Sequence, residues 1–200
     1  MANHKYLDKL INEVNNLREK IDFCEIDTSS CSFSYMLKKK TSFVGYKQGY
    51  FENLIQEQNG MKESNDLRAT AKDYLKYIKN KDNDVLQIES YVKGKLDCLF
   101  QVHWIEGKRY LFPFAAKGWR YPTYVYVTCY DGNTISEEYM VNGNQIVYEA
   151  YSRITDTEVT YHMTNYVSGG KYPVLETREG MLQLNPLSYK ETAYDNWMNH

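Results

Sequence analysis

The fold is decided by residues 123–167, which read TYVYVTCYDGNTISEEYMVNGNQIVYEAYSRITDTEVTYHMTNYV. Within 123–130, valines and a cysteine alternate with tyrosines and a threonine. Successive side chains of a strand point to opposite faces of a sheet, so this alternation predicts a strand with one apolar face. A similar alternation recurs in 145–154 and 157–167. All three segments are therefore predicted to be strands.

Turn signals separate these strands. Asp131-Gly132 and Asn142-Gly143 contain residues that tolerate the positive φ of tight hairpin turns. Short turns make consecutive strands antiparallel, because a parallel pair needs a long crossover. The strands expected in this meander are 85–93, 98–106, 109–115, 123–130, 134–141, 145–154 and 157–167.

The alternation also assigns the strand residues to two faces. The face expected to pack on helices carries Val125, Val127, Cys129, Ile146, Tyr148, Ala150, Ile154, Val159, Tyr161, Met163 and Val167. The other face is expected to carry tyrosines, threonines and a few charges, including Tyr124, Tyr126, His162, Thr164 and Tyr166. Two arrangements fit: an open sheet with the tyrosines outside, or a half-barrel or barrel around a tyrosine-lined cavity. Long meanders tend to curl, since closure removes exposed edges.

The N-terminal part is predicted to be helical. Residues 4–23 carry an apolar stripe at helical spacing, formed by Leu7, Leu10, Val14, Leu17 and Ile21. This helix is expected to pack on the sheet rather than on a second chain. Residues 25–34 are expected to form a loop or lead into a strand, and 50–58 a short helix. Ser64 is an expected N-cap for a further helix over 66–80.

These elements predict an α+β fold, with N-terminal helices packed on a C-terminal antiparallel β-meander that forms a curved sheet, half-barrel or barrel. A chain of 200 residues fits a single domain over 1–200. We expect residues 1–84 to be mainly helical and 85–170 to form the antiparallel sheet. Residues 171–200 are then expected to be a C-terminal extension packed on it.

Composition narrows the functional classes. The formal net charge of -2 disfavours a dedicated duplex-DNA binder, which needs a strongly basic face. The sequence shows neither a secretory signal nor an 18-residue apolar run, so we expect a cytoplasmic location and no membrane association. The frequent Lys and Asn residues suit a microbial or phage genome. The cysteines, expected to be reduced and to hold no metal, are Cys24, Cys31, Cys98 and Cys129.

The case for catalysis rests on two histidines. No nucleophile elbow, zinc-protease motif or phosphate-binding glycine loop is present, and no cofactor is predicted. His103 and His162 lie inside predicted strands, and Glu106 is close to His103 in sequence. If both histidines faced one tyrosine-lined cavity, they could supply general acid–base chemistry. A ligand-binding or catalytic half-barrel is therefore one functional hypothesis, although each histidine could also be an ordinary sheet residue.

Residues 33–51, FSYMLKKKTSFVGYKQGYF, interleave lysines with aromatic rings. Cations that follow phosphates, together with rings that stack on bases, are what single-stranded nucleic acid requires. Because the chain is nearly neutral and has only one such cluster, single-stranded nucleic-acid binding is the weakest of the three functional hypotheses. A solvated lysine turn between two segments anchored in the core explains this cluster better.

The leading hypothesis is a protein-binding module. The chain has 20 Tyr against 7 Phe, so many rings are expected where a hydroxyl reaches water or a partner. Tyr, Trp and Arg carry much of the binding energy at protein interfaces. The expected centre of the interface consists of Trp119, Arg120, Tyr121, Tyr124 and Tyr126. We expect a small inhibitor or immunity-type protein that acts by forming a stoichiometric complex.

Overall fold

The computed structural model describes residues 3–37, 63–68, 70–115, 124–132, 134–184 and 187–196. Its elements are α1 (His4–Lys20), β1 (Ser32–Leu37), β2 (Tyr74–Lys79), β3 (Val85–Val92), β4 (Lys95–Ile105), β5 (Lys108–Ala115), β6 (Val125–Asp131), β7 (Thr134–Asn142), β8 (Gln145–Arg153), β9 (Glu158–Val167), β10 (Val174–Leu184) and β11 (Leu187–Asn196).

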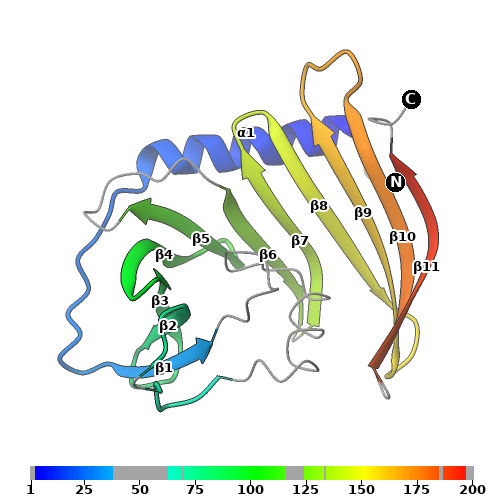
Figure 1. Cartoon of the computed structure of the whole chain (residues 1–200). Helices are drawn as coiled ribbons and strands as arrows, with labels where there is room; N and C mark the ends of the chain where they lie inside the picture. The colour runs from blue at the N-terminus through cyan, green and yellow to red at the C-terminus, as the bar shows by residue number, and fades with distance from the viewer. Residues whose placement is uncertain are drawn as a thin grey trace.

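The strands form one antiparallel meander. Each strand pairs with its neighbours in the chain, so the spatial order runs from β1 to β11 without a crossover. Among the described residues β1 and β11 are the two edges, and the sheet is therefore open. Figure 1 shows α1 lying across one face, with β1–β4 turned out of the plane of the later strands. The predicted meander is confirmed, and it extends further at both ends.

The turns and the N-terminal helix follow the sequence closely. Gly132 and Gly143 have φ values of +59° and +58°, the left-handed conformation expected of the two hairpin turns. In α1, the stripe buries Leu7, Leu10 and Val14 against the sheet, as predicted. The helix begins after Asn3, whose side chain accepts a hydrogen bond from the Lys5 N–H.

The helix predicted over 66–80 is wrong, because Tyr74–Lys79 is strand β2. Its sequence, YLKYIK, is rich in residues that favour strands. Pairing with β1 on one side and β3 on the other supplies the backbone hydrogen bonds that a helix would have made internally. The division of the chain changes accordingly. Residues 1–84 contain two strands, and 171–200 contains β10 and β11 rather than a mere extension. Residues 50–58 lie outside the described part.

One face assignment is also wrong. Val125 on β6 and Ile146 on β8 point toward α1, as predicted. On β9, however, Tyr166 pairs with Ile146 and therefore shares the face that carries α1. Val159, together with its neighbours Tyr161 and Met163, packs on the opposite face. The turn between β8 and β9 sets this register, and a shift of one residue exchanges the faces of a whole strand.

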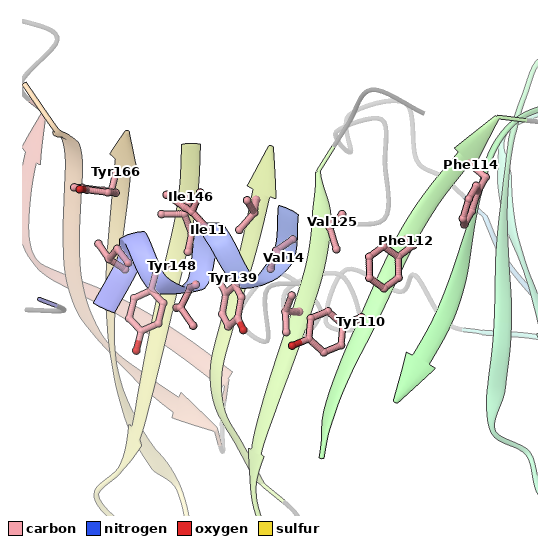
Figure 2. Close-up of a cluster of buried hydrophobic side chains, with 14 of the residues drawn as sticks. Ile11, Val14, Tyr110, Phe112, Phe114, Val125, Tyr139, Ile146, Tyr148 and Tyr166 are labelled. Atoms are coloured by element: carbon pink, nitrogen blue, oxygen red, sulfur yellow. The ribbon is translucent and has the colours of Figure 1, made fainter. Parts of the chain in front are cut away.

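Apolar clusters lie on both faces of the sheet. The face that carries α1, called the helix face below, holds the largest cluster, and Figure 2 shows its rings and aliphatic side chains gathered on neighbouring strands beside α1. The opposite face holds two smaller clusters, one over β2–β5 and one over β8–β10. In the described part of the chain, no helix is long and apolar enough to cross a membrane.

Candidate functional site

The structure describes only part of the predicted binding centre. Trp119, Arg120 and Tyr121 lie outside the described residues. Tyr124 is half-buried, and its hydroxyl donates a hydrogen bond to Oε1 of Gln145 at 3.2 Å. Tyr126 is also half-buried. Its ring packs edge-on against Phe100 at 5.8 Å in an apolar cluster of the opposite face. Tyr126 therefore contributes to packing as well as to any binding surface.

His103 lies on the helix face of β4, where its ring meets Phe112 edge-on at 5.5 Å. Burial lowers the pKa of this imidazole, and its Nε2 atom is buried without a hydrogen-bond partner among the described residues. Glu106 lies in the exposed turn after β4 and has a positive φ of 50°. The buried surroundings of His103 favour the neutral form of its imidazole. Glu106, in the exposed turn, makes no hydrogen bond or ion pair with that imidazole among the described residues.

His162 lies on β9, with β5, β6, β7 and β8 between it and the strand of His103. The two histidines therefore share a face but not a site. His162 instead meets two polar side chains, Glu179 and Thr164. Its Nδ1 lies 3.2 Å from Oε1 of Glu179, and its Nε2 lies 2.9 Å from Oγ1 of Thr164.

A group of three residues that the sequence reasoning missed lies on the opposite face, where β4, β5 and β6 approach their turns. This group, called the rim patch, consists of Trp104, Arg109 and Tyr130. Trp104 is 60% exposed although it belongs to a regular strand, and its ring lies 5.6 Å from that of Tyr130. Arg109 lies directly opposite Trp104 in the strand register. The patch thus combines an exposed indole with a neighbouring phenol and guanidinium.

Hydrogen bonds join Arg109 of the rim patch to two buried polar residues. Nη2 of Arg109 donates to Oγ1 of Thr128 at 3.3 Å, and this hydroxyl donates to Oε1 of Glu138 at 3.2 Å. Thr128 and Glu138 are 0% and 4% exposed, so the chain of bonds runs into the protein interior. Burial raises the pKa of Tyr130, and the positive charge of Arg109 opposes that rise. Nη2 of Arg109 is therefore anchored to the interior, whereas its Nε is buried without a hydrogen-bond partner among the described residues.

The helix face carries a second polar group, beside α1. The Tyr6 hydroxyl donates to Oε2 of Glu137 at 2.8 Å, which joins α1 to β7. The Tyr110 hydroxyl donates to Oε1 of Glu13 at 2.5 Å, which joins β5 to α1. The Tyr139 hydroxyl, on β7, is buried without a hydrogen bond of normal geometry to any described residue.

Figure 2 shows Tyr110, Tyr139 and Tyr148 on this face. Burial raises the pKa of all three hydroxyls further above neutral pH. The neutral hydroxyls of Tyr6 and Tyr110 donate to carboxylates across the boundary between α1 and the sheet, and these bonds hold the helix in place. This second group consequently acts as an anchor for α1.

All four cysteines are free in the structure. Cys98 is buried on the opposite face, whereas Cys129 lies half-buried on the helix face, so the two cannot share a metal ion. Burial, with a smaller contribution from Glu137, raises the pKa of Cys129 to about 11. Such a thiol is a poor nucleophile at neutral pH. Within the described residues no group of His, Cys, Asp and Glu side chains could hold a metal ion.

One signal in the sequence could have indicated the rim patch. Trp104 lies in the predicted strand 98–106, two residues before the turn at Glu106-Gly107. An aromatic ring so near a turn has few neighbours to cover it. Its position beside Tyr130 depends on the pairing of three strands, which the sequence alone does not specify.

No family model, curated protein or solved structure matches this chain.

Proposed function

We propose that this protein is a binding module of the inhibitor or immunity type, which forms a stoichiometric complex with another protein through the rim patch. The observation that carries this proposal is the exposure of Trp104. This strand residue is 60% exposed, and its ring lies beside that of Tyr130. Exposing so large an apolar ring costs free energy in the unbound protein, and a partner that covers it would recover that cost.

The composition of the rim patch fits a protein partner. Trp, Tyr and Arg are the residues most enriched among those that dominate interface energies. All three come from adjacent strands of a sheet, which holds them more firmly than a loop would. The bonds from Arg109 to Thr128 and on to Glu138 restrict the guanidinium before binding. A side chain ordered in advance loses less conformational entropy when the complex forms.

The test compares two exposed aromatic residues at opposite ends of the sheet. Trp104→Ala removes the centre of the rim patch. Tyr172→Ala is the matched control, because Tyr172 is 66% exposed in the turn between β9 and β10. Wild-type chain and both variants would be immobilised and exposed to lysate of the native host, and captured protein would be identified and quantified. The affinity of the purified partner and the melting temperature of each variant would then be measured.

We expect wild type and Tyr172→Ala to capture the same protein in a one-to-one ratio. Trp104→Ala should bind that protein with a free energy weaker by about 2 kcal/mol or more, at an unchanged melting temperature. Equal binding by all three chains would place the interface elsewhere. A large fall in the melting temperature of Trp104→Ala would show that the indole is a packing residue, contrary to the proposal.

A further inference from the structure

We propose that Thr164, His162 and Glu179 form a hydroxyl–imidazole–carboxylate triad that accepts small acyl groups from esters. This activity is separate from the proposed protein binding, because the triad lies on the helix face of β9 and β10 and the rim patch lies on the opposite face of β4–β6. It rests on a different observation, the contacts of His162.

The two ring nitrogens of His162 meet groups of opposite chemical role. Nε2 lies 2.9 Å from the Thr164 hydroxyl oxygen, and Nδ1 lies 3.2 Å from Oε1 of Glu179. We assign the ring proton to Nδ1, because a carboxylate accepts a hydrogen bond and cannot donate one. Nε2 is then free to accept the proton of the hydroxyl. A nucleophile, a base and a group that orients the base are the parts of a Ser-His-Asp triad, which is recognised by geometry rather than by sequence position.

The sheet holds these three side chains in place. His162 and Thr164 are two residues apart on β9, so they point to the same face. Glu179 lies directly opposite His162 on β10. On the other side of His162, the opposing residue on β8 is Ala150. The side chain of Ala150 is a single methyl group, so on that side the register places no large side chain directly opposite the imidazole.

The proposed reaction needs only two reactants, the ester and water. The Thr164 oxygen attacks the ester carbonyl carbon while its proton passes to Nε2 of His162. The bond from carbon to the leaving oxygen then breaks, and the alcohol departs with that proton. Water attacks the acyl-threonine in the same way, releasing the carboxylic acid and restoring the threonine hydroxyl. Thr177 lies directly opposite Thr164 on β10.

Burial limits the substrate. Thr164 is 4% exposed, and the side chain of His162 is 18% exposed. A nucleophile so nearly covered can be reached only by a small acyl group, while a larger alcohol portion stays in solvent. We therefore expect acetyl esters to react and long-chain esters to be excluded.

The test uses the full chain and p-nitrophenyl acetate. Release of p-nitrophenol gives the rate, and peptide mass spectrometry locates the acetyl group. Thr164→Val removes the hydroxyl while conserving the shape of the side chain, and Thr164→Ser retains a hydroxyl. His162→Gln removes the base, and Glu179→Gln removes the orienting charge. Thr160→Val is the matched control: Thr160 is on the same strand and face, and its hydroxyl donates to the Ser152 carbonyl at 3.2 Å.

We expect acetyl-Thr164 in wild type, Thr164→Ser to be acetylated at the same position, and Thr160→Val to match wild type. Thr164→Val and His162→Gln should lose the acetylated species. Glu179→Gln should lower the rate by a factor of about 10² to 10⁴ at an unchanged melting temperature. Absence of acetyl-Thr164 in wild type would overturn the proposal. Hydrolysis above the uncatalysed rate that continues at the wild-type rate in Thr164→Val would also overturn it, because the ester would then be cleaved by other side chains.

Discussion

At the scale of single residues, Glu13 shows how one carboxylate joins α1 to the sheet. It accepts a hydrogen bond from the Tyr110 hydroxyl and forms an ion pair with Lys108 at 2.7 Å. Burial raises the pKa of Glu13, but the hydrogen bonds from Lys108 and Tyr110 outweigh burial and hold that pKa below its ordinary value. The folded state therefore favours the ionised carboxylate more than the unfolded state does.

This pKa difference predicts how stability depends on pH. A carboxyl group with a lowered folded pKa stabilises the fold above its unfolded pKa, and that stabilisation is lost as pH falls through the folded pKa. Glu13→Gln should therefore flatten part of the acid limb when the free energy of unfolding is measured from pH 7 downward. Asp27→Asn provides a comparison on an exposed carboxyl in the segment that follows α1, whose pKa is also lowered, by hydrogen bonds from Ser29. Parallel acid limbs for wild type and Glu13→Gln would show that the contacts of Glu13 do not contribute.

At the scale of elements, α1 combines an apolar stripe with polar contacts along its flanks. Leu7 and Val14 are fully buried against the strands. On the flanks, Asp8 accepts from the Tyr166 hydroxyl at 2.8 Å, and Asn15 donates to the Gly143 carbonyl at 2.8 Å. The stripe supplies non-directional burial, whereas the directional flank contacts determine how the helix lies across the strands.

A charge placed in this stripe tests its role. Val14→Asp should destabilise the fold by about 3–5 kcal/mol, because it buries an unpaired carboxylate in an apolar cluster. Asn12→Asp is the control, since it adds the same charge to the exposed side of the helix. Urea denaturation gives both free energies of unfolding, and sedimentation gives the oligomeric state. Unchanged unfolding of Val14→Asp together with lost self-association would mean that the stripe joins two chains instead.

At the scale of the whole molecule, the sheet has apolar side chains on both faces, and α1 covers one of them. Without α1, residues such as Val125, Val127, Val141 and Ile146, each at 0% exposure in the intact protein, would lose their cover. An extended sheet with an uncovered apolar face, and with β11 as an edge strand among the described residues, is prone to aggregate. The helix is therefore expected to be necessary for a soluble fold.

Removing residues 1–20 tests this expectation. The shortened chain should aggregate or lose its cooperative thermal transition, as measured by size-exclusion chromatography and circular dichroism. A synthetic peptide spanning residues 1–21 should restore the transition if it is added during refolding. The same peptide carrying Val14→Asp should fail to do so. A monomeric shortened chain with the melting temperature of wild type would show that α1 is dispensable.

What the sequence determined by itself is the local part of the architecture. Alternation in 123–130 and 145–154 predicts strands because a strand exposes one residue in two to each face. Gly132 and Gly143 predict the turns because glycine tolerates positive φ. The stripe of α1 follows from the helical period. Each of these inferences uses residues close together in the chain, where covalent geometry restricts the conformation.

Strand pairing, strand register and the contacts between side chains depend on residues distant in the sequence, and only the tertiary structure shows them. Residues 74–79 fit a helix or a strand by pattern, and pairing with β1 and β3 makes them a strand. The register of β9 against β8 selects the face of His162. Trp104 meets Tyr130, and His162 meets Glu179, across separate strands. Strand register is a cooperative choice over many backbone hydrogen bonds and both apolar faces, so no local run of residues specifies which side chains will meet.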